Sequence, residues 1–103
     1  RLLKEQFDKI DIQTTFQSRF GPQEWLTPYT DKTIEDLPSK GIKNLLVICP
    51  GFASDCVETL EEINIQGKEA FIKKGGVNFD LIPCLNDNSD HINLFEKLVK
   101  KYL

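Results

Sequence analysis

The amino-acid sequence predicts an α/β protein, a three-layer parallel sheet flanked by helices, as a single domain over residues 1–103. Residues 12–18, 44–49 and 79–84 read as strands, because each run is short and rich in apolar, β-branched or aromatic side chains. Amphipathic stretches of helical period separate these runs, and Gly and Pro residues mark their ends. Strands that alternate with helices indicate a parallel sheet, whose ligands gather beyond the carboxyl ends of the strands.

Each element has its own signals. Residues 44–49 form an unbroken apolar run, which is typical of a strand buried on both faces. We expect Thr30 or Asp31 to cap a helix that ends before Gly41, and Ser54 or Asp55 to cap a second helix. The second helix should run to Lys74, ahead of a Gly-Gly pair, and an amphipathic helix should occupy residues 90–102.

The first residues read as the remainder of a helix. Leu3, Phe7 and Ile10 recur at helical spacing, and no capping residue precedes them. The chain begins with Arg1 and contains no Met. We interpret it as a fragment of a longer protein.

Composition excludes several classes of function. The net charge is −3, and Lys residues alternate with acids, so no nucleic-acid-binding surface is expected. No apolar run approaches the roughly 20 residues of a membrane-spanning helix. Nothing in the sequence excludes a peripheral contact of the whole protein with a membrane, and nothing argues for one. The three unevenly spaced cysteines fit neither a disulfide nor a zinc framework, and an iron–sulfur cluster usually needs four thiolates. We therefore expect reduced thiols, no such cluster and a cytoplasmic location.

The loop after the first predicted strand offers a ligand wall. Trp25 lies between two prolines and could present a flat apolar surface, and Gln17 and Ser18 could supply polar contacts. The same Trp could equally be a core residue that closes the loop. Composition leaves both interpretations open.

Acidic residues recur on the second predicted helix. Glu58 and Glu62 are four residues apart, so they share a helix face, and Gln66 continues the row. Stacked carboxylates suit the passage of a cation or the transfer of protons. The alternative is that acids near a helix N-terminus interact with the helix dipole. The only histidine, His91, is expected in a solvent-exposed or capping role.

Three segments carry a family resemblance. The motifs Gln-Ser-Arg-Phe-Gly-Pro-x-x-Trp-Leu, from Gln17, and Pro-Gly-Phe-x-Ser-Asp-Cys-x-Glu-Thr-Leu-x-Glu, from Pro50, occur in the order and separation seen in ferrochelatases. The run from Ile82 to Asp87, Ile-Pro-Cys-Leu-Asn-Asp, is similar to the bacterial members. The sequence therefore resembles the C-terminal half of a bacterial-type ferrochelatase, a lyase of heme biosynthesis that inserts ferrous iron into a porphyrin.

The resemblance implies a fold of two similar α/β domains with a porphyrin cleft between them. Glu58 matches a glutamate assigned to proton handling or metal delivery, and Glu62 matches the next acid on the metal route. Ser18 and Trp25 match residues that line the porphyrin pocket. Ferrous iron and porphyrin are then the substrates, and the chain needs no cofactor of its own.

Some positions depart from the family pattern. Gln66 stands where many members have a third acid, and Cys56 stands where some have a second histidine. The family's essential histidine belongs to the N-terminal half, which the resemblance implies as the partner of this chain. We therefore expect the chain alone to be inactive. The alternatives are a non-catalytic α/β ligand-binding or regulatory half-domain and a related chelatase for another tetrapyrrole.

Overall fold

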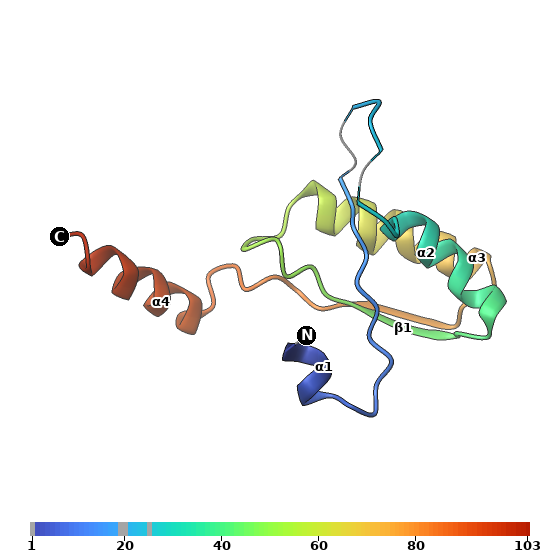
Figure 1. Ribbon diagram of the computed structural model, residues 1–103, viewed down its shortest axis with the longest axis horizontal. Coiled ribbons are helices and arrows are strands. Elements are labelled where there is room, and N and C mark those ends of the chain that lie inside the picture. Colours follow the sequence, from blue (N-terminus) through green and yellow to red (C-terminus); the bar gives the residue numbers. More distant parts are fainter. Residues whose placement is uncertain (1, 19–20, 25) are drawn as a thin grey trace.

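The computed structural model describes residues 2–18, 21–24 and 26–103 (Figure 1). Its helices and strands alternate along most of the chain, in the order α1 Leu2–Gln6, α2 Thr30–Asp36, η1 Leu37–Lys40, β1 Asn44–Val47, η2 Glu58–Gly67, α3 Lys68–Lys73, β2 Asn78–Leu81 and α4 Ser89–Lys100. The helices η1 and η2 are a 3₁₀ helix and a π-helix, respectively.

The two strands pair in parallel, which confirms the α/β class. Their register runs from Asn44 opposite Asn78 to Val47 opposite Leu81. At the start of this register the Asn78 side-chain amide donates a hydrogen bond of 2.7 Å to the Asn44 side chain. The helices η2 and α3 form the crossover that parallel pairing requires.

The expectation that β1 is buried on both faces is wrong. Leu45 and Val47 are half-buried and pack against the core, whereas the intervening Leu46 is 63% exposed. Figure 1 shows α2 and α3 on one side of the strands. Alternate residues of β1 therefore face the helices, and the others face away from them.

Residues 12–18 do not form the predicted strand. Within this segment Phe16 makes an isolated parallel bridge to Tyr29, and Ser18 at its end has a positive φ. The Phe16 N–H donates to the carbonyl of Pro28 at 2.9 Å, and the Thr30 N–H donates to the carbonyl of Phe16 at 3.0 Å. The segment thus pairs with the far end of the loop that follows it, and not with β1 or β2. We call this bridge the loop neck.

The helix after the loop neck ends where the sequence predicts. Gly41 follows η1 in a left-handed conformation with φ of 86°, which a residue without Cβ adopts without strain. Its start differs from the prediction, because the N-cap position is Tyr29 and no side chain caps it. Thr30 instead points its hydroxyl to that of Thr15, at 2.8 Å.

The crossover helix occupies the predicted region but is wound in two ways. Its first ten residues, η2, form a π-helix, and α3 continues it as an α-helix. Neither Ser54 nor Asp55 caps it as expected, since the N-cap position is Val57. The predicted end is confirmed, because Lys74 closes α3 and Gly75 follows with φ of 106°.

The core lies between the helices and the strands. It contains six buried apolar residues, which are Ile34, Leu37, Cys49, Ile63, Phe71 and Phe79. Phe71 of α3 has no exposed surface, and its ring centroid lies 5.8 Å from that of Phe79 in β2. This aromatic pair anchors the crossover helix to the sheet.

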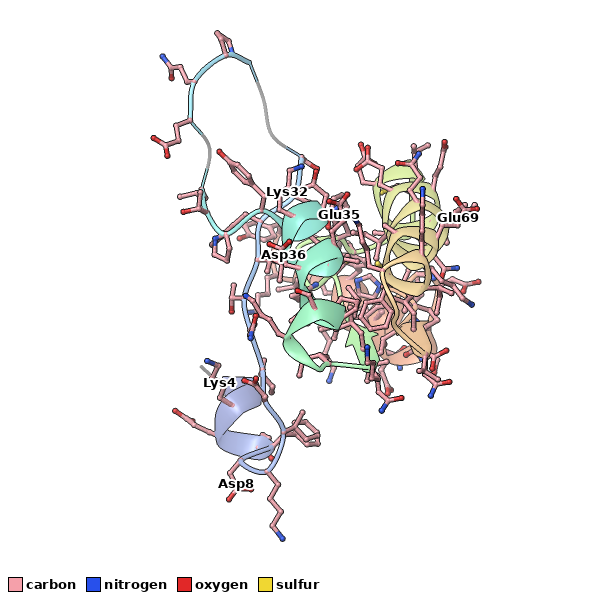
Figure 2. All side chains as sticks on the ribbon, turned by 90° about the vertical axis from the view of Figure 1, so that its right-hand side faces the viewer. Lys4, Asp8, Lys32, Glu35, Asp36 and Glu69 are labelled. Atoms are coloured by element: carbon pink, nitrogen blue, oxygen red, sulfur yellow. The ribbon has the colours of Figure 1, made fainter. Side chains whose placement is uncertain are left out.

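Charged side chains lie on the outside of this unit. Figure 2 shows Lys32 and Asp36 on α2 and Glu69 on α3, all at the outer surface of the helices. The same view places α1, which carries Lys4, and the following turn, which carries Asp8, apart from that helix layer. None of the helices in the described part of the chain has the length and apolar character that crossing a membrane requires.

The C-terminal helix α4 extends away from the sheet, as Figure 1 shows. The radius of gyration is 16.1 Å, whereas a compact domain of this length has about 13 Å. The apolar residues of α4 are between 42% and 55% exposed, and they are Ile92, Leu94, Phe95, Leu98 and Val99. An apolar surface of this kind is typical of an interaction face.

We expect the isolated chain to self-associate through α4. Leu98→Glu places a charge on the apolar face of the helix and should shift the chain toward monomer, whereas Lys97→Glu on a neighbouring exposed position should not. Sedimentation velocity over a range of concentrations measures this. A chain that stays monomeric at every concentration would contradict the prediction.

Candidate functional site

The carboxyl ends of two predicted strands, residues 12–18 and 44–49, meet at the start of η2. Gln17, just past the loop neck, donates a hydrogen bond of 3.2 Å from its side-chain amide to the carbonyl of Glu58. The Cys49 thiol, two residues past β1, lies 3.7 Å from the Gln17 side-chain oxygen and donates to it. The chain therefore brings residues 17, 49 and 58 together, at the strand edge where the sequence predicts a site.

Glu58 carries an ionised carboxylate. Hydrogen bonds from the Cys56 thiol and from its own backbone N–H hold the pKa of the Glu58 carboxyl below its usual range. Its side chain is partly exposed, so a ligand can reach it. Both features suit a group that attracts a cation.

The π-winding of η2 brings a different set of side chains to one hollow. The hydrogen bonds of a π-helix join residues five apart, which is the spacing of Cys56, Glu61 and Gln66, although Cys56 itself lies just before η2. These three line a shallow hollow of about 360 Å³, together with Val57, Leu60 and Ile65. Glu62 is exposed and does not line it. Gln66 therefore shares this hollow with Glu61, a residue that an α-helical spacing does not single out.

The predicted porphyrin-contacting residues are only partly described. Ser18 is exposed and has a positive φ of 62°, in a loop that its neighbour Gln17 ties to Glu58. Trp25 lies outside the described residues. Its assignment as a pocket wall stays a prediction.

A second polar cluster joins η2 to the turn after β2. The Asp55 carboxylate accepts hydrogen bonds from the Asn86 amide at 2.8 Å, the Thr59 hydroxyl at 2.9 Å and the Cys84 N–H at 3.2 Å. These hydrogen bonds lower the pKa of Asp55. In return, the Asn86 side-chain oxygen accepts from the Asp55 N–H at 2.8 Å. Asp55 and Asn86 both lie in the sequence motifs, but no rule of local spacing predicts a contact between residues this far apart in the sequence.

Two thiols near this cluster, those of Cys49 and Cys84, have raised pKa values. Burial is the main cause that raises the pKa of Cys49, and it raises that of Cys84 to about 11, with further contributions from Asp55. Among the residues that the structure describes, no group of three or more His, Cys, Asp or Glu side chains could hold a metal ion. The absence of an iron–sulfur cluster stays a prediction.

His91 has a structural role that differs from the expected one. It is only 8% exposed, and Asn88, not His91, caps α4 with its side chain. The carbonyl of Asn86 accepts a hydrogen bond of 2.7 Å from His91 Nδ1, which must carry the proton in this arrangement. Its ring also packs on Phe95, with centroids 4.4 Å apart.

Fold and site together define an α/β protein with a carboxylate at the ligand edge of a parallel sheet. The sequence matches the family model for ferrochelatase over residues 1–103. The chain belongs to the ferrochelatase family.

Similar proteins support this membership. The chain is 60% identical over 92 residues to a ferrochelatase of Vibrio vulnificus (strain YJ016), covering 89% of this chain and 29% of that protein. It is 56% identical to a ferrochelatase of Yersinia enterocolitica with the same coverage of both. A ferrochelatase of Agrobacterium fabrum is 53% identical over all of this chain and 30% of its own length. The chain therefore spans about three tenths of the length of these relatives.

Proposed function

We propose that this chain forms part of the site at which a ferrochelatase inserts ferrous iron into a porphyrin. Family membership implies these two substrates and a place in heme synthesis. The observation that carries the proposal is the position of Glu58. It is an ionised carboxylate at the start of a π-helix, at the ligand edge of the sheet, inside the motif that matches the family. π-Helical segments frequently mark functional sites.

Glu58 is better suited to passing on a cation than to accepting a proton in the free site. A lowered pKa makes a carboxylate a weaker base, because it holds a proton less tightly. The same hydrogen bonds keep the group charged, and oxygen ligands exchange readily on ferrous iron. We assign Glu58 to metal delivery, with proton acceptance as a second role once the porphyrin excludes water.

The outer acids have lesser roles in this proposal. Glu62 is exposed and follows Glu58 further along η2. In this proposal it would meet the hydrated cation first. Gln66 is neutral, but Glu61 lies next to it in the hollow, so the outer end of the route still has a negative charge. Ser18 and Trp25 are assigned to the porphyrin wall on the family motif alone.

Iron insertion by a full-length ferrochelatase in which this chain replaces the matching segment tests the proposal. We expect that hybrid to metallate porphyrin anaerobically with ferrous iron, and the isolated chain to show no measurable turnover, because the family's essential histidine lies outside it. Loss of porphyrin absorbance and gain of heme absorbance measure the reaction. A hybrid that folds and binds porphyrin but never inserts iron would favour the non-catalytic alternative.

A further inference from the structure

We infer that Asn86 is a positioning residue for Glu58, acting through a reciprocal bridge with Asp55. The inference rests on the proposed function of Glu58 and adds a residue from the turn after β2 to the site. The bridge joins two parts of the chain that are 31 residues apart. Within that turn, Asn86 is the residue whose side chain bonds both the carboxylate and the backbone N–H of Asp55.

Asn86 makes contacts in two directions. Its side chain donates to Asp55 and accepts from the Asp55 N–H, both at 2.8 Å. Its backbone N–H donates to the carbonyl of Ala53 at 3.0 Å, and its carbonyl accepts from His91 at 2.7 Å. It holds a left-handed conformation with φ of 50°, which Asn tolerates better than most residues. The turn is thus fixed to the loop before η2 on one side and to α4 on the other.

Asp55 connects the turn after β2 to η2 through a hydrogen bond to Thr59. Its carboxylate accepts from the hydroxyl of Thr59, a residue with no exposed surface. The Thr59 hydroxyl in turn accepts from the Cys56 N–H at 3.0 Å. Residues 55, 56 and 59 are therefore fixed to one another on both sides of Glu58 in the sequence.

Glu58 lies in the sequence between Cys56 and Thr59, the two residues that this arrangement fixes to each other, and a hydrogen bond from the Cys56 thiol lowers the pKa of its carboxyl. A second restraint on Glu58 is the hydrogen bond that its backbone carbonyl accepts from the Gln17 side-chain amide. A chain of contacts therefore runs from Asn86 to Asp55, Thr59, Cys56 and Glu58. Supporting hydrogen bonds of this kind hold a reacting group in its productive geometry.

Asn86→Gly in the full-length hybrid tests the inference. Glycine keeps the left-handed backbone and both backbone hydrogen bonds and removes only the side chain. We expect kcat to fall by roughly tenfold to a hundredfold with little change in KM for porphyrin, since displacement of a catalytic group by about 1 Å can cost this much. Asp55→Asn should act in the same direction, because its amide presents a donor where Asn86 and the Cys84 N–H both donate. Asp87→Gly, an exposed position in the same turn, is the matched control and should leave kcat unchanged.

A double-mutant cycle separates positioning from a general structural effect. In a Glu58→Gln background, Asn86→Gly should cost little further activity, because the group that it positions is already gone. If the two losses multiply while thermal unfolding shows both variants folded, the inference is wrong and the proposed role of Glu58 stands. If Glu58→Gln alone leaves kcat unchanged, the proposed role of Glu58 fails, and the inference fails with it.

Discussion

Replacing Glu58 by Gln in the full-length hybrid is expected to lower kcat by roughly 10²–10⁴-fold, with folding little changed. Gln keeps the shape of the side chain and its hydrogen-bonding reach but removes the charge that attracts the cation. The effect should be larger in kcat than in KM for porphyrin, because the role proposed for the carboxylate is on iron and protons and not on the macrocycle wall. Steady-state kinetics under anaerobic conditions measure both.

The neighbouring positions provide graded controls for this effect. Glu62→Gln should lower kcat less than Glu58→Gln does, since Glu62 is exposed and lies further along η2. Gln66→Ala should be tolerated, because that position is already neutral. If Glu58→Gln turned over normally while Gln66→Ala did not, the assigned order of the residues would be reversed. Glu58 would then be a solvated carboxylate near a helix start.

Gly76→Ala is expected to give the largest loss of stability among glycine substitutions in the chain. A Cβ at this position would lie 2.2 Å from two ring carbons of Phe71, and that ring is fully buried against Phe79. The ring cannot move aside without disturbing the core, so the free energy of unfolding should fall by about 1–3 kcal/mol. Urea denaturation gives the change from the transition midpoint.

Gly51→Ala is the matched control for Gly76→Ala. A Cβ on Gly51 would meet no heavy atom within 4 Å, and its backbone needs no positive φ. Stability should therefore stay the same or rise slightly, because alanine restricts the unfolded chain. Equal losses at both positions would show that the Phe71 contact is not the cause.

The sequence predicts most of the element order, because that order depends on local patterns. The helix before Gly41 and the crossover helix end at glycine stops, α4 follows an apolar periodicity, and the structure confirms all three. The predicted strand at residues 12–18 is wrong for a physical reason. Its alternating pattern fits an extended segment, but whether such a segment joins a sheet depends on a partner strand that no local pattern specifies.

The candidate site is predictable only in part. Glu58 and Glu62 are visible in the sequence as acids at a strand-to-helix junction, and the structure places Glu58 there. A periodicity of 3.6 residues per turn does not predict the π-helical winding of η2. The sequence therefore does not predict that Glu61 and Gln66 line the same hollow. The bridge of Asp55 to Asn86 is missed because folding, not spacing, brings them together.

The loop neck has a consequence for how this family can diversify. Two backbone hydrogen bonds between residues 16, 28 and 30 close the loop at its base. Lengthening a loop that is closed in this way costs only about 0.6 kcal/mol for each doubling of its length. Residues between the two ends of the loop neck can therefore be inserted, deleted or exchanged at little cost in loop-closure entropy. The same neck is a natural junction for loop grafts between relatives, since the graft ends would meet an unchanged backbone pairing.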